Sequence, residues 1–95
     1  MKILAIEHEK PGLQALDFQN YLIEEAQQLW QLYLAGEVRE IYFRTDTHEA
    51  VIILECPGPA EARSILDALP LVRARLISFE IIPLGPYDGF ARLFT

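Results

Sequence analysis

The sequence predicts an α+β fold in which a four-stranded antiparallel sheet carries two helices on one face. The segment AVIILE, residues 50–55, begins with five apolar residues, contains several β-branched side chains and is too short for a helix. Such a run is typical of a strand buried on both faces. Segments 2–6 (KILAI) and 76–82 (LISFEII) have the same character, and only two segments of the chain show helical periodicity.

Two helices can cover only one face of such a sheet. The apolar strands lack the apolar–polar alternation that a sheet with one solvated face shows. Hydrophobic residues make up 52% of the chain and its mean hydropathy is +0.15, which favours an additional buried surface. A second copy of the chain is the simplest cover, so the sequence predicts a homodimer or a larger homo-oligomer.

Length, composition and charge limit the possible classes of protein. The chain of 95 residues is expected to be a single domain, residues 1–95. No apolar run approaches the ~18 residues of a membrane helix, and the N-terminus lacks the features of a signal peptide. The lone Cys56 predicts a reducing, cytoplasmic setting. A net charge of −6 repels polyanions, so neither nucleic acid nor an anionic membrane is an expected partner.

The first half of the chain is expected to contain a strand, a helix and a second strand. Residues 1–8 form the first strand, which ends at the loop around Pro11 and Gly12. Asp17 is a suitable N-cap for a helix that runs to about residue 35, and Gly36 suits the left-handed position that follows a helix. The inner stripe of this helix is predicted to be Phe18, Leu22, Ala26 (or Glu25), Leu29 and Tyr33.

The second half is expected to contain a hairpin, a helix and a last strand. Residues 38–44 and 50–55 form a hairpin with a short turn at 45–47. Pro59 suits the first position of the second helix, and Pro70 is expected to end it. The fourth strand covers residues 76–82. Prolines and glycines exclude regular structure beyond it, but the tail contains Phe90, Leu93 and Phe94, so we expect it to dock on its own or on a partner subunit.

The element order is strand–helix–strand–strand–helix–strand. Right-handed crossovers place both helices on the same face of the sheet and make the first and third strands central. This is the ferredoxin-like βαββαβ arrangement.

With the elements placed, the chain resembles the muconolactone-isomerase-like proteins of the dimeric α/β-barrel group. The resemblance covers about two thirds of the chain and rests on AGEVREIYFRTDTHEAVIILECPGPAEARSILDALPL, followed by FEIIPL. The matching positions are Gly36, Arg39, Arg44, His48, Glu55, Pro57 and Leu69-Pro70-Leu71. The resemblance implies two sheets packed face to face in a dimer, with pockets between the sheet and helices or loops. It also implies, for some relatives, isomerisation of a lactone by proton transfer.

Proton transfer needs an acid and a base that reach one substrate atom. Glu80, Glu55 and His48 are the candidate catalytic residues. Glu80 interrupts the apolar FEII, so it faces either a pocket, where desolvation would raise its pKa, or an arginine such as Arg39, Arg44 or Arg75. Glu55 lies at the end of a strand and His48 beside a turn, and both are also compatible with ordinary surface positions.

Arg44, Tyr42 and His8 are the candidate substrate-binding residues. Arg44 could hold a carboxylate through two parallel hydrogen bonds, or it could be a paired surface group. Tyr42 and Phe43 point to opposite faces, so one of them should reach the pocket or the interface. His8 follows the first strand in a loop rich in charge.

Several other kinds of site are absent from the sequence. There is no CxxC or His/Cys cluster that would predict a metal site, and no glycine-rich phosphate loop. The central strands lack the aromatic and basic residues of an RNA-binding sheet. No metal or cofactor is therefore predicted, and Cys56 is expected to be a small buried hydrophobe.

The sequence thus predicts a small homodimer that binds a small organic acid or lactone and can isomerise it by metal-free proton transfer. Two alternatives stay open. One is a non-catalytic dimeric module for ligand binding or assembly. The other is a cofactor-free oxygenase, which would need an apolar cavity lined by Tyr42, Tyr33 or Phe90.

Overall fold

The computed structural model describes residues 1–95. Its centre is one four-stranded antiparallel sheet with the strand order β2-β3-β1-β4. The strands are β1 (Lys2–Glu9), β2 (Val38–Phe43), β3 (Ala50–Glu55) and β4 (Ile77–Leu84). The first and third strands are central, as predicted, and β2 and β4 are the two edges.

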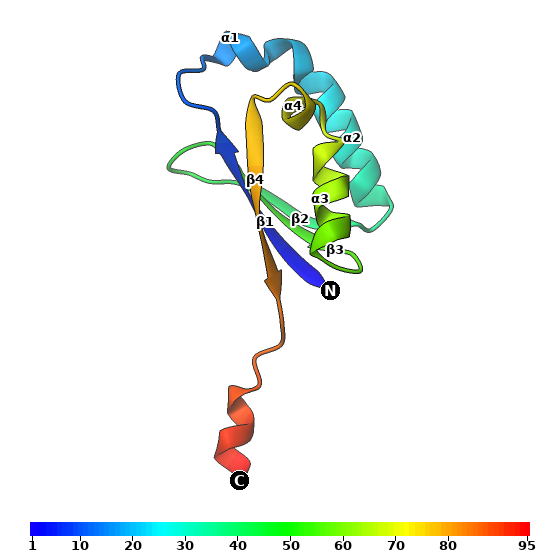
Figure 1. Ribbon diagram of the computed structural model, residues 1–95, viewed down its shortest axis with the longest axis vertical. Coiled ribbons are helices and arrows are strands. Elements are labelled where there is room, and N and C mark those ends of the chain that lie inside the picture. The colour runs from blue at the N-terminus through cyan, green and yellow to red at the C-terminus, as the bar shows by residue number, and fades with distance from the viewer.

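The helices before the tail lie on one face of this sheet (Figure 1). The longest, α2, packs against β2, whereas α3 packs against β4. The ferredoxin-like fold predicted from the sequence is therefore confirmed. The helical elements are α1 (Ala15–Phe18), the 3-10 turn η1 (Gln19–Tyr21), α2 (Leu22–Leu34), α3 (Pro59–Asp67), α4 (Pro70–Arg73) and the 3-10 helix η2 (Gly89–Phe94).

Two helix boundaries differ from the prediction. Gln14, not Asp17, is the N-cap of the first helix, and the Asp17 carboxylate accepts a hydrogen bond of 2.7 Å from the Gln14 backbone N–H. Pro70 begins α4 instead of ending α3, because a proline without an N–H fits the first turn of a helix, where that group has no partner. Asp17 and Pro70 were thus correctly recognised as boundary residues but were assigned the wrong positions.

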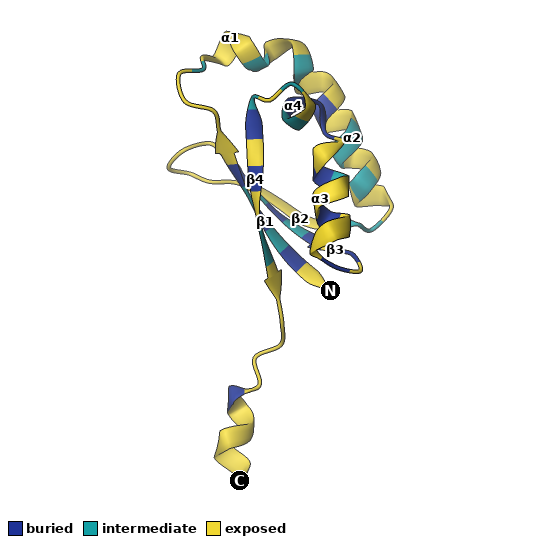
Figure 2. Cartoon of the chain, in the orientation of Figure 1, coloured by how far each residue is buried: buried dark blue, intermediate teal, exposed yellow.

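The hydrophobic core lies between the sheet and the helices. Ile3, Ile52 and Leu54 are fully buried there, together with Leu66 and Leu69 from the helical layer. The alternate residues of the central strands point to the opposite face, which carries no helix (Figure 2). We call this the helix-free face; its half-buried apolar side chains are Leu4, Ile6, Val51, Ile53 and Ile82.

The C-terminal tail does not dock on its own subunit. It leaves β4 and projects from the body of the chain (Figure 1). The longest extent of the molecule is 57 Å and its radius of gyration is 15.4 Å, against ~12 Å for a compact chain of this length. The tail also contains η2, although the sequence predicted no regular structure there.

Gly36 provides a direct test of the backbone at the end of α2. Its φ of +81° is the left-handed conformation expected after a helix, and a Cβ added there would meet nothing closer than 4.0 Å. Gly36→Ala should therefore lower the free energy of unfolding by about 1 kcal/mol through backbone strain alone. Urea unfolding measures this, with Gly85→Ala as the control because Gly85 has no left-handed φ and faces open space. If the two variants had equal free energies of unfolding, the expected backbone strain at residue 36 would be contradicted.

Candidate functional site

The structure brings two of the predicted site residues, His8 and Glu80, together on the helix-free face. The two side chains come from the neighbouring strands β1 and β4. Nε2 of His8 lies 3.3 Å from Oε1 of Glu80, and both side chains are about half exposed in the single chain. The partner of Glu80 is thus a histidine rather than one of the arginines considered from the sequence.

His8 also lines a hollow beside this pair. The hollow has a volume of about 420 Å³ and lies where β1 ends and β4 begins. Two cationic residues, Lys10 and Arg75, and one acidic residue, Glu9, contribute to its wall, so cations outnumber carboxylates there although the chain as a whole is acidic. The full lining is His8, Glu9, Lys10, Pro11, Val72, Arg75, Ile77 and Ser78.

Arg75 occupies an unusual backbone conformation at this hollow. Its φ is +62°, and its N–H donates to the carbonyl of Val72 over 2.9 Å in the turn between α4 and β4. A residue with a side chain costs of order 1 kcal/mol in this region. Strained residues of this kind cluster at ligand sites. The conformation of Arg75 therefore supports this hollow as a candidate ligand site.

Glu55 lies at the opposite end of the sheet. It is aligned with Lys2 in the register of β1 and β3, and its carboxylate lies 3.3 Å from the N-terminal amine of Met1. Lys2 and His8 are six positions apart on β1, which corresponds to about 20 Å along a strand. The structure therefore does not bring Glu55 together with His8 and Glu80.

Arg44, Tyr42 and His48 each have a local partner in or beside the β2–β3 hairpin. The Arg44 guanidinium donates two hydrogen bonds to the Asp46 carboxylate, of 2.9 and 2.7 Å, and thereby lowers the pKa of Asp46. The Tyr42 hydroxyl donates to Glu40 over 2.7 Å. The ring of His48 stacks on that of Phe43 with centroids 4.1 Å apart. These side chains form no joint cavity with Glu80 among the hollows described.

Two buried carboxylates, Glu7 and Glu25, were not among the predicted site residues, although Glu25 was the alternative to Ala26 in the predicted inner stripe of the first helix. Each is only 8% exposed. Glu7 accepts a hydrogen bond from the Ala50 N–H over 3.2 Å, and Glu25 accepts one from the Leu71 N–H over 3.0 Å. Burial raises the pKa of both, and that of Glu7 reaches about 7, helped by the nearby charges of Glu9, Glu49 and Glu25.

A signal for both residues was present in the sequence. Glu7 continues the alternation of Ile3 and Ala5 along β1, and these two residues are fully buried on the helix side. Glu25 lies on the same helical stripe as Leu29 and Leu32, four and seven positions further along α2. The alternation along β1 therefore places Glu7 in the core, and the helical stripe favours Glu25 over Ala26.

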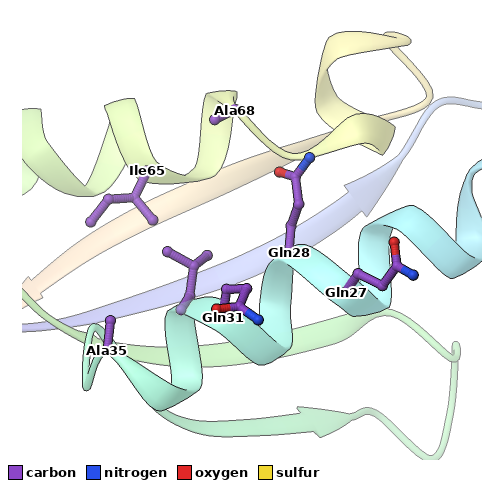
Figure 3. Close-up of a pocket in the computed structure, with 7 residues that line it drawn as sticks. Gln27, Gln28, Gln31, Ala35, Ile65 and Ala68 are labelled. Atoms are coloured by element: carbon purple, nitrogen blue, oxygen red, sulfur yellow. The ribbon is translucent and has the colours of Figure 1, made fainter.

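A second hollow lies between α2 and α3 (Figure 3). Its volume is about 510 Å³, and amide side chains dominate its polar wall. None of its lining residues titrates, so it has no group that could transfer a proton. The lining is Gln27, Gln28, Gln31, Leu32, Ala35, Ile65 and Ala68.

The comparisons with known proteins define the fold class. No protein-family model and no curated protein sequence matches the chain. Among solved structures, a muconolactone isomerase matches with a TM-score of 0.76 at 14% identity, over 94% of this chain and 93% of the other. A 5-chloro-2-hydroxyhydroquinone dehydrochlorinase from Burkholderia phenoliruptrix, in complex with 2,5-dihydroxybenzoquinone, matches with a TM-score of 0.62 at 18% identity, over 94% and 98%.

The chain therefore belongs to the ferredoxin-like α+β class. Within that class it has the fold of muconolactone isomerase, as the resemblance in its sequence indicated. At these identities the likeness establishes the fold alone. No helix of the structure has the length and apolar character that crossing a membrane requires.

Proposed function

We propose that the chain forms a homodimer that binds a small organic acid or lactone and moves a proton on it without a metal. One observation carries this proposal: His8 contacts Glu80 and also lines the hollow that contains Lys10 and Arg75. A carboxylate, an imidazole and two cations at one place are the groups that binding an anion and transferring its proton require. Two solved structures that share this fold belong to enzymes of small molecules, a muconolactone isomerase and a 5-chloro-2-hydroxyhydroquinone dehydrochlorinase.

The roles follow from the chemistry of these groups. Lys10 and Arg75 would hold a carboxylate of the ligand at the hollow. Glu80 would take a proton from a carbon next to a carbonyl group, and His8 would return a proton to another atom of the same ligand. An isomerisation leaves the number of protons and electrons unchanged, so this pair needs no redox partner.

A second copy of the chain would cover the helix-free face, which has no cover in the single chain. The helix-free face presents apolar side chains on both central strands, and a second sheet packed on it would remove them from water. His8 and Glu80 lie on the same face, so the second copy would also reduce the water around them. Lower solvation strengthens the interaction of charged groups with a ligand. The unpaired, buried Cys56 is compatible with the cytoplasm, where we place the protein.

Ligand binding and proton exchange test this proposal separately. A panel of small carboxylic acids and lactones, including muconolactone, is titrated calorimetrically, and exchange of ligand protons in D₂O is followed by NMR. Glu80→Gln should slow this exchange by about 100-fold or more while binding persists. Lys10→Gln and Arg75→Gln should each weaken binding about 10-fold.

Arg44→Gln is the matched control, because it removes a cation that is already bound to Asp46. Loss of binding in this variant alone would place the anion at the hairpin and contradict the site. Full exchange in Glu80→Gln would contradict the role of Glu80.

A non-catalytic ligand-binding module is the second candidate. The His8–Glu80 pair is half exposed in the single chain, and Arg44, Tyr42 and Glu55 are all engaged within the chain. Binding without proton exchange in the experiment above would favour this function. The oxygenase alternative has no supporting contact, because neither hollow is lined by Tyr33, Tyr42 or Phe90.

A further inference from the structure

The C-terminal segment, residues 85–95, contains the 3-10 helix η2 and projects away from the rest of the chain. Tyr87 packs edge-on against Phe90, with ring centroids 5.0 Å apart, within the segment itself. Its apolar side chains are nevertheless among the most exposed of the molecule, at 67% for Phe90, 74% for Leu93 and 84% for Phe94. Figure 2 shows η2 exposed along almost its whole length and away from the body. Such a segment gains its apolar burial only on another molecule.

Helix α2 has a second apolar stripe that is not part of the core. Leu22, Trp30 and Tyr33 are each about half exposed, and Trp30 stacks on Tyr33 with centroids 5.7 Å apart. At 100° per residue Leu22 and Tyr33 fall on the side of α2 opposite Gln31, and Trp30 lies about 60° around the helix from Tyr33. Gln31 lines the hollow shared with α3, so Leu22 and Tyr33 face away from α3 and toward the free edge of β2.

Strand β2 continues this apolar surface. Ile41 is aligned with Ile52 and Phe43 with Ala50, and both partners are buried on the helix side. Ile41 and Phe43 therefore face the same side as α2, yet they are 42% and 62% exposed. We call the surface formed by Leu22, Trp30, Tyr33, Ile41 and Phe43 the α2–β2 surface. It is too apolar to be left in water without a partner.

The symmetry of a face-to-face dimer connects the tail with this surface. A two-fold axis between the sheets and parallel to the strands reverses the strand order, so β4 of one copy comes beside β2 of the other. These are the two unpaired edges of each sheet. β4 runs parallel to β3 and therefore antiparallel to β2, which is the direction an antiparallel ladder needs. With this axis, β4 of each copy can pair with β2 of the other. No strand edge is then left unpaired, as in a closed barrel.

The same arrangement determines where the tail emerges. The end of β4 of one copy lies beside the start of β2 of the other, because the two strands are antiparallel. Val38 begins β2 only four residues after α2 ends at Leu34, so the last turns of α2, with Trp30 and Tyr33, lie close by. The extended residues 85–88 and the 3-10 helix η2 span ~25 Å, which exceeds the ~10 Å between a sheet and the layer packed on it.

We propose that the C-terminal segment of one copy packs its aromatic side chains on the α2–β2 surface of a second copy. The inference rests on the proposed homodimer and adds an interface that the sheet packing alone does not provide. Two such segments, related by symmetry, would bury three aromatic rings each. Aromatic side chains bury ~150–250 Å² apiece, so the two tails add on the order of 1,000 Å², comparable with a small interface.

Trp30 is the only tryptophan of the chain and reports directly on this contact. At concentrations where sedimentation gives a dimer, its emission should be blue-shifted and poorly quenched by acrylamide. Phe90→Ser combined with Phe94→Ser should shift the emission to the red, raise quenching several-fold and weaken the dimer about 100-fold. Arg92→Ser, in the same segment but without loss of apolar surface, should leave all three measurements unchanged.

A mixture of two variants, each with one added cysteine, identifies the chain that supplies the tail. A chain with Phe94→Cys and a chain with Tyr33→Cys should form a mixed disulfide on oxidation, because Cys56 is buried. A disulfide only within a doubly substituted chain, with Trp30 shielded at any dilution, would show that the tail binds its own subunit and overturn the inference. A dimer with exposed Trp30 would overturn it and leave the homodimer intact. A monomer would overturn both.

Discussion

Ile53→Asp is expected to convert the dimer into folded monomers. Ile53 lies on the central strand β3, opposite Leu4 of β1, and both side chains face the helix-free side. In a face-to-face dimer two aspartates would enter the interface by symmetry, each without a cation to pair with. An unpaired buried charge costs several kcal/mol, so the dissociation constant should rise by about 1,000-fold or more. Sedimentation velocity measures the result, and circular dichroism shows whether the fold persists.

The neighbouring position makes this test specific. Ile52 is fully buried against the helices, so Ile52→Asp should unfold the chain itself instead of separating the copies. Ser64→Asp, on the exposed side of α3, adds the same charge away from the interface and should leave the dimer unchanged. A folded, dimeric Ile53→Asp variant, or a wild-type chain that is a monomer at micromolar concentration, would exclude the helix-free face as the interface.

The fold could be predicted from the sequence because its strongest signals are local and agree with one another. The apolar run at 50–55 and the segment KILAI are central strands, as their lack of alternation indicated. The left-handed Gly36 follows the helix as expected. Because crossover connections are right-handed, the order of strands and helices is compatible with only a few topologies. Once the elements were assigned correctly, the fold followed from their order.

Which side of α2 packs on the sheet was harder to predict, because this helix has apolar residues around more than half of its circumference. Leu22 and Tyr33 were predicted to lie in the inner stripe, but both are exposed in the structure. The inner side instead carries the half-buried Leu32 and the buried Glu25, which was the alternative to Ala26 in the prediction. When two apolar stripes compete, the hydrophobic pattern alone does not say which one faces the sheet. Here the outer stripe is the one for which we propose a partner.

The candidate site depends on pairings that a single sequence does not show. His8 and Glu80 are 72 residues apart and meet only because β1 and β4 are neighbours in a particular register. Arg75 and Lys10 enter the same hollow from two different loops. Local patterns identified Glu80 and His8 as candidates, but their partnership required the sheet. The roles of Glu80, Glu55, His48, Arg44, Tyr42 and His8 remain predictions.

The stability of the protein should fall between about pH 5 and pH 8 because of Glu7. Its pKa is about 7 in the folded chain, against an ordinary value of 4.5 for a glutamate. Between these values the folded chain binds more protons than the unfolded chain, so the free energy of unfolding decreases as the pH rises. The stabilisation is complete below the unfolded pKa and is lost above the folded one. A shift of this size corresponds to about 3 kcal/mol, and Glu25, whose pKa is also raised by burial, acts in the same direction.

Glu7→Gln should remove most of this pH dependence. The amide oxygen of Gln can still accept the hydrogen bond from the Ala50 N–H, but the side chain no longer ionises. Near pH 8 the variant should be more stable than the wild type by up to about 3 kcal/mol, and near pH 5 the difference should be small. Urea unfolding at a fixed protein concentration measures both. Asp67→Asn, which neutralises an exposed carboxylate on α3, is the control and should keep the wild-type slope. A wild-type stability that does not change across this interval would show that Glu7 is not protonated in the folded chain.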